Sequence, residues 1–225
     1  MLFSAIVVSI PRMAMLLGKQ KNCEANLVAS DMLSTTISIV IPAVVGCIAL
    51  AYEIIVLISD ATYVSAVTSH VILTIAILFS MGGYFWGHAV LIPMKEENFY
   101  LVVTIVSALV NVGLNFALIP FFDVNAAAFT TLFAEVVAFL MCYFKGRKHV
   151  KTTGVIKTFI KSAIASLVIF PIVVLFKYVI SNTVLYVIVC IVLSVLLYFA
   201  LSLILGNQAV TSICKSVISK FKRGK

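Results

Sequence analysis

The stretch FIKSAIASLVIFPIVVLFKYVI, residues 159–180, is separated by two residues from TVLYVIVCIVLSVLLYFALSLIL, residues 183–205. Lys161 and Lys177 are the charged residues that these two segments contain. Each segment is long enough to cross a bilayer, since a helix needs roughly 20 apolar residues to span about 30 Å of hydrocarbon. Lipid offers no partner to an unpaired backbone group, so an open segment crosses a membrane as a helix. The pair predicts a transmembrane helical hairpin.

Further apolar segments precede this hairpin. Those at 33–58, 64–92, 99–119 and 124–144 are also long enough to cross, whereas the one at 2–17 is short and carries Pro11 and Arg12. The chain is 63% hydrophobic and 11% charged, while soluble domains are roughly 45–50% apolar and about 25% charged. We therefore predict an all-α, polytopic transmembrane helix bundle of about seven helices, the first of them incomplete.

Basic residues alternate between the connections that join these segments. Apart from Lys177, the Lys and Arg residues fall within or beside every second connection, namely 18–31, 94–98, 145–161 and the tail after Gly206. Cytoplasmic connections carry an excess of Lys and Arg. We therefore expect a multi-pass protein of a bacterial cytoplasmic (inner) membrane with a cytoplasmic C-terminus. An odd number of crossings then places Met1 outside.

The same pattern divides the chain into four parts. We expect transmembrane helices over 1–144, a basic cytoplasmic loop over 145–158, a terminal hairpin over 159–205 and a basic amphipathic tail over 206–225. In the tail, apolar residues recur at helical spacing from Val210 to Phe221, which is typical of a helix lying in the membrane interface. Topology and anionic lipids account for the net charge of +8, so we expect no nucleic-acid partner.

Motifs of enzymes and metal sites are missing from the sequence. It contains no GxSxG, HExxH or Walker loop, and its five cysteines form no CxxC pair. His70, His88 and His149 are too scattered to share a metal ion. We expect no enzymatic activity, no catalytic residue, no metal and no cofactor.

Ionisable residues inside apolar segments are better candidates for function, because a charge in the bilayer needs a cavity or a partner. Glu135 lies roughly 16 Å along its helix, near the midplane. It either exchanges protons, holds a cation or packs as a neutral residue. Glu53 lies near the outer end of its helix, where its side chain either faces a cavity or reaches interfacial water. Arg12 either reaches the inner interface or grips a pyrophosphate.

Asn111 and Asn115 complete the candidates for a substrate or cation pathway. They are four residues apart and share a helix face. Two amides on one helix face either tie helices together or bind sugar hydroxyls. We favour the first role, in which they contribute to helix packing.

The stretch NVGLNFALIPFFDVNAAAFTTLFAE, residues 111–135, resembles a signature of polysaccharide repeat-unit flippases. These are the O-antigen and capsule (Wzx-type) exporters of the multidrug/oligosaccharidyl-lipid/polysaccharide superfamily. In their C-terminal lobe, an Asn-rich helix ends in a Leu-Ile-Pro-like corner, and a Gly-containing turn, small residues and a helix bearing a Glu follow. The matching residues are Asn111, Asn115, Leu118, Ile119, Pro120, Ala127, Ala128 and Glu135. Asp123 and Ala126 depart from the pattern, since the family often has glycine there.

Further stretches are similar to the same family, namely SIPRMAMLLGKQ, IPAVVGCIALAYEIIVLIS and MKEENFY. The resemblance implies the C-terminal lobe of a two-lobe fold with a cavity between the lobes, which makes a missing N-terminal lobe, on the same or a separate chain, a partner. It also implies transport of undecaprenyl-pyrophosphate-linked oligosaccharide for surface polysaccharide synthesis, with this lipid and membrane lipids as the other partners.

Three other functions stay open. The first is another transporter of the superfamily, either a drug/cation antiporter or a peptidoglycan-precursor flippase. The second is an inactive remnant or membrane scaffold. The third, a membrane glycosyltransferase or polymerase, is disfavoured because the sequence shows neither a large outer loop nor a cluster of carboxylates.

Overall fold

The computed structural model describes residues 4–212 and 214, with side chains from Ser9 on, and this part of the chain is helical without strands. The elements run in the order α1 (Ser4–Gly18), α2 (Asn22–Ala49), α3 (Ala51–Ile58), η1 (Ala61–Tyr63), α4 (Ala66–Tyr84), the π-helical η2 (Phe85–Leu91), α5 (Glu97–Gly146), α6 (Val155–Ser166), α7 (Ile169–Lys177) and α8 (Thr183–Ile204). The predicted all-α fold class is confirmed.

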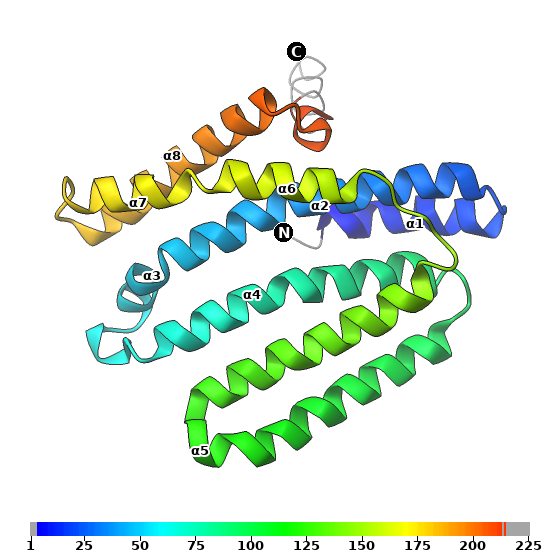
Figure 1. Cartoon of the computed structure of the whole chain (residues 1–225), viewed down its shortest axis with the longest axis horizontal. Helices are drawn as coiled ribbons and strands as arrows, with labels where there is room; N and C mark the ends of the chain where they lie inside the picture. Colours follow the sequence, from blue (N-terminus) through cyan, green and yellow to red (C-terminus); the bar gives the residue numbers. More distant parts are fainter. Residues whose placement is uncertain (1–3, 213, 215–225) are drawn as a thin grey trace.

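Five helical segments are long and apolar enough to cross a membrane: 22–49, 66–91, 97–146, 155–177 and 183–204. The third of these, α5, has 50 residues, and at 1.5 Å per residue it would measure about 75 Å, far more than the bilayer core. It instead folds back on itself at Asp123, where φ is 48° and ψ is −134° (Figure 1). The chain is a multi-pass membrane protein, and the two legs of α5 are the two crossings expected from the sequence.

The basic connections meet at one end of the molecule. The links α1–α2, α4–α5 and α5–α6 lie together on the right of Figure 1, and the links α3–α4 and α7–α8 lie on the left. Contacts join the basic links: Lys145 Nζ lies 2.9 Å from Glu96 Oε1, and the Lys151 amide donates to Asn26 Oδ1 over 2.8 Å. Alternate connections therefore share an end, which we call the basic end. Its cytoplasmic location stays a prediction.

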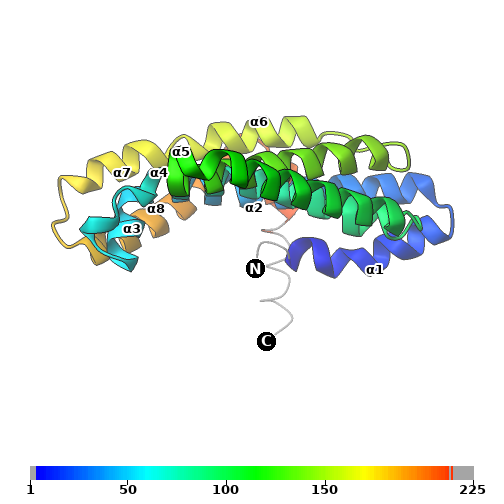
Figure 2. The same ribbon diagram turned by 90° about the horizontal axis from the view of Figure 1, so that it is seen from below.

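The helices form a flattened slab (Figure 2) with two apolar cores. One core joins α1, α2, η2 and α5 around Met13, Phe85 and Val103, each at most 1% exposed. The other joins α2, α7 and α8 around Leu50, Ile169 and Cys190. Large apolar side chains such as Phe116 and Leu196 cover the outside, as expected where lipid is the solvent.

Several boundaries differ from those expected. The helix expected from Leu33 begins at Asn22, because a helix satisfies its own backbone and continues past the hydrocarbon. The loop expected over 145–158 is shorter, since α6 begins at Val155. The hairpin helix expected over 159–180 is split after Ser166, because Pro171 lacks the N–H that would bond the carbonyl of Leu167. The amphipathic tail falls largely outside the described residues.

Candidate functional site

A chain of polar side chains crosses between the two legs of α5. The Thr130 hydroxyl donates to Asn115 Oδ1 over 2.6 Å, and Asn115 Nδ2 donates to Asn111 Oδ1 over 2.8 Å. Asn111 Nδ2 then donates to Thr131 Oγ1 over 3.3 Å, and Thr131 donates to the Ala127 carbonyl over 2.8 Å. Thr130 is fully buried. We call Asn111, Asn115, Thr130 and Thr131 the hairpin cluster.

The hairpin cluster ties the two legs together, as favoured from the sequence. Its oxygen atoms also form a compact group of amide, hydroxyl and carbonyl ligands, the type that hard cations prefer and that bonds sugar hydroxyls. Sequence reasoning missed Thr130 and Thr131. Their positions in the sequence could have revealed them. Asn115 and Thr131 lie equally far from the turn at Asp123, so a hairpin places them opposite each other.

Glu135 follows Thr131 by one helical turn on the second leg of α5, so the two share a face. It is half-buried and within electrostatic reach of the Tyr100 hydroxyl on the first leg. Three of the five candidates, Asn111, Asn115 and Glu135, therefore lie on one hairpin. Its surface has a hollow of about 440 Å³ that Asn115 and Pro120 help to line.

Glu53 lies elsewhere, at the end of the molecule opposite the basic end. Its carboxylate accepts a hydrogen bond from Lys177 Nζ over 3.2 Å, and its side chain is only 9% exposed, against 59% for Lys177. The ammonium also lies 5.4 Å from the centre of the Tyr52 ring. Lys177 therefore bonds across to α3, and its ion pair with Glu53 joins α3 to α7.

Arg12 is exposed on α1. Among the described residues, no hydrogen bond or ion pair links Arg12 or Glu53 to the hairpin cluster. The five candidates thus occupy three separate places.

The basic end carries an ionic cluster that sequence reasoning did not single out. Glu96 Oε1 lies 2.9 Å from Lys145 Nζ and 3.5 Å from His149 Nε2. The hydrogen bond from Lys145 lowers the pKa of the Glu96 carboxyl below its ordinary value, and the charges of Lys145 and His149 add to this. The cluster joins the link before α5 to the link after it. No group of His, Cys, Asp and Glu in the described chain is arranged to hold a metal ion.

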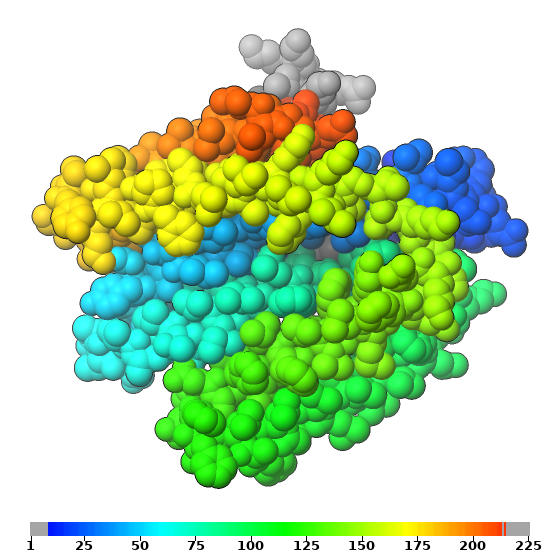
Figure 3. Space-filling view, in the orientation of Figure 1, coloured from blue at the N-terminus to red at the C-terminus, as the bar shows by residue number. Residues whose placement is uncertain are grey.

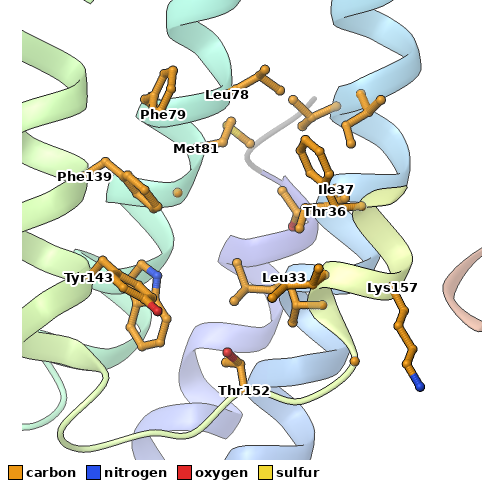
Figure 4. Close-up of a pocket in the computed structure, with 18 residues that line it drawn as sticks. Leu33, Thr36, Ile37, Leu78, Phe79, Met81, Phe139, Tyr143, Thr152 and Lys157 are labelled. Atoms are coloured by element: carbon orange, nitrogen blue, oxygen red, sulfur yellow. The ribbon is translucent and has the colours of Figure 1, made fainter. Parts of the chain in front are cut away.

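A larger cavity of about 750 Å³ lies between α2, α4, α5 and α6, and the surface is hollowed between α6 and α5 (Figure 3). Phe139 and Tyr143 form one wall, Leu33 and Ile37 form the other, and Thr152 closes the basic end (Figure 4). None of the five sequence candidates lines this cavity.

Comparisons with known proteins bear on the fold. No protein-family model matches the chain, and no curated protein matches it. Among solved structures, it is similar to the lipid II flippase MurJ in an inward closed conformation. The TM-score is 0.76 at 20% sequence identity, over 93% of this chain and 44% of that one.

This similarity shows that the chain has the fold of part of a flippase. It spans less than half the length of MurJ. The predicted flippase lobe is therefore confirmed as a fold. The match does not distinguish the Wzx-type exporters of the sequence resemblance from other flippases.

Proposed function

We propose that this chain forms one lobe of a membrane transporter that flips lipid-linked oligosaccharide precursors across the cytoplasmic membrane. The observation that carries the proposal is the shared fold with a lipid II flippase over 93% of the chain. The apolar crossings and the alternation of basic connections agree with such a transporter. No covalent bond is made or broken in this function, so it needs no catalytic residue.

The mechanism we propose is alternating access, in which two lobes rock about a central site. The sugar-phosphate head group occupies the site between the lobes while the lipid tail stays in the bilayer. The two cores of this chain move together as part of one lobe, since α2 contributes residues to both.

The hairpin cluster and Glu135 are our candidates for coupling transport to a cation or proton. Polar side chains inside membrane-spanning segments are rare and mark candidate ion pathways. Glu135, one turn away, adds a negative charge that attracts a cation. In the complete transporter, Glu135→Gln should abolish coupling without affecting folding, and full transport by this variant would exclude the role.

Two substrate classes each have a specific observation in their support. The signature over 111–135 supports a polysaccharide repeat unit, whereas the structural neighbour supports a peptidoglycan precursor. Both are oligosaccharides on a polyprenyl pyrophosphate, so the lobe would meet the same lipid and phosphate chemistry in either case.

Deletion of the gene in its host tests the proposal. If the chain is part of a flippase, a lipid-linked oligosaccharide should accumulate in the inner leaflet, and re-expression of the complete gene should reverse this. Mass spectrometry of the accumulated lipid then identifies either the repeat unit or the peptidoglycan precursor. Accumulation of neither lipid would refute the proposal and favour a drug/cation antiporter, a scaffold or a remnant.

A further inference from the structure

The cavity between α2, α4, α5 and α6 has mainly apolar walls. Leu33 and Ile37 of α2 face Phe139 and Tyr143 of α5 across it (Figure 4). Thr36, the polar residue on the α2 wall, already donates its hydroxyl to the Met32 carbonyl over 2.8 Å. The walls therefore suit a hydrocarbon chain better than a sugar.

The basic end of the cavity is held in place by hydrogen bonds. Here the Lys151 amide donates to Asn26 Oδ1 over 2.8 Å, and the Thr153 amide donates to Ser30 Oγ over 3.0 Å. These bonds fix the link between α5 and α6 against α2, so the mouth beside Thr152 is formed before any ligand arrives.

Lys157 lines the cavity, and Lys151 directly precedes Thr152 at its mouth. Lys145 pairs with Glu96, but no ion pair among the described residues involves Lys151 or Lys157. No acidic residue follows Glu135 in the sequence. Lys157 extends from α6 toward the end at which Thr152 lies (Figure 4), as expected of an amine that reaches toward the head groups.

We propose that this cavity is a binding site for an anionic phospholipid. One acyl chain lies between the α2 and α5 walls, and the phosphate lies at the mouth against Lys151 and Lys157. Basic pockets between helices at one membrane surface bind anionic head groups in this way. The inference is independent of the transported substrate.

Native mass spectrometry of the full chain in detergent micelles tests the site, with phosphatidylglycerol and phosphatidylcholine as probes. One lysine near an anionic surface contributes about 1 kcal/mol, so Lys157→Ala should weaken phosphatidylglycerol binding about fivefold. Phosphatidylcholine binding should not change. Lys19→Ala, which removes an exposed lysine from another link at the same end, is the matched control and should have no effect.

A second pair of variants tests the acyl-chain cavity. Leu78 lines the cavity and Leu73 lies outside it on the same helix. Leu78→Trp should abolish binding of the tightest phosphatidylglycerol molecule, and Leu73→Trp should leave it intact.

Several results would overturn the proposal. They are equal affinity for phosphatidylglycerol and phosphatidylcholine, equal losses of phosphatidylglycerol affinity in Lys157→Ala and Lys19→Ala, and unchanged phosphatidylglycerol binding in Leu78→Trp. Complete displacement of phosphatidylglycerol by equimolar undecaprenyl phosphate would also overturn it, because the cavity would then hold a substrate tail.

Discussion

The hydrogen bond between Thr130 and Asn115 offers a direct test of how the α5 hairpin is held together. Thr130→Val keeps the shape of the side chain and removes the hydroxyl that donates to Asn115 Oδ1 over 2.6 Å. Thr130 is fully buried, so water cannot replace the lost donor. Hydrogen bonds between membrane helices contribute about 0.6 kcal/mol on average and up to about 1.7 kcal/mol. We expect Thr130→Val to lower the free energy of unfolding by about 1 kcal/mol, because this bond is short and buried.

A double-mutant cycle isolates this bond from the rest of the hairpin cluster. Asn115→Ala also removes the donor to Asn111, so it should cost about 2 kcal/mol, one hydrogen bond more than Thr130→Val. In the double variant, Thr130→Val should add little. The expected coupling is about 1 kcal/mol, which corresponds to roughly a fivefold change in the unfolding equilibrium.

The assay is reversible unfolding of the full chain by SDS in mixed micelles, followed by circular dichroism. Thr104→Val is the control, because its hydroxyl donates to the Tyr100 carbonyl on an exposed face of the first leg. Thr104 lies about 16 Å along the helix from Asn115, so the two changes should be additive. Additivity of Thr130→Val and Asn115→Ala within about 0.3–0.5 kcal/mol would refute the proposed bond.

Three further predictions concern other contacts. Asp123 has a φ of 48°, and such a conformation strains a residue other than glycine by about 1–3 kcal/mol, so Asp123→Gly should raise the SDS midpoint of unfolding; a lower midpoint would contradict the strain. Lys177→Met should lower stability by about 1 kcal/mol, a value reduced because Lys177 is largely exposed, and adding Glu53→Gln should restore most of it; no recovery would show that the loss does not come from an unpaired Glu53. The lowered pKa of Glu96 means that its bond to Lys145 is present above the ordinary carboxyl pKa and is lost as the pH falls below it. Unfolding midpoints between about pH 6 and about pH 3 should therefore fall more steeply for the natural chain than for Glu96→Gln, and parallel curves would exclude the contribution.

The crossings were predictable because apolar length is a local property of the sequence. The segments at 99–119 and 124–144 fall within the two legs of α5, and the turn expected at Asp123 is where the chain reverses. The departure from glycine at that position did not prevent the turn, although glycine adopts a φ of 48° more readily than aspartate does. The start of α2 was predicted too late, because hydropathy reports where lipid begins and not where a helix begins.

The candidate site was predictable only in part. Spacing alone placed Asn111 and Asn115 on one face, and the structure adds that they bond each other. Their partners Thr130 and Thr131 lie on the other leg, so they become neighbours only when the hairpin closes. Glu53 and Lys177 are 124 residues apart, and no local pattern connects them.

The sequence by itself determined the solvent, the number of long crossings and the alternation of basic connections, because each depends on residues near one another in the chain. The tertiary structure decided which polar groups have partners. Helix packing made Glu53 and Lys177 an ion pair and joined the hairpin cluster across two legs. It also left a cavity beside Lys157, which has no ion-pair partner among the described residues. These outcomes depend on the distances between helices, which apolar periodicity leaves open because each apolar helix face packs about equally well against lipid or another helix.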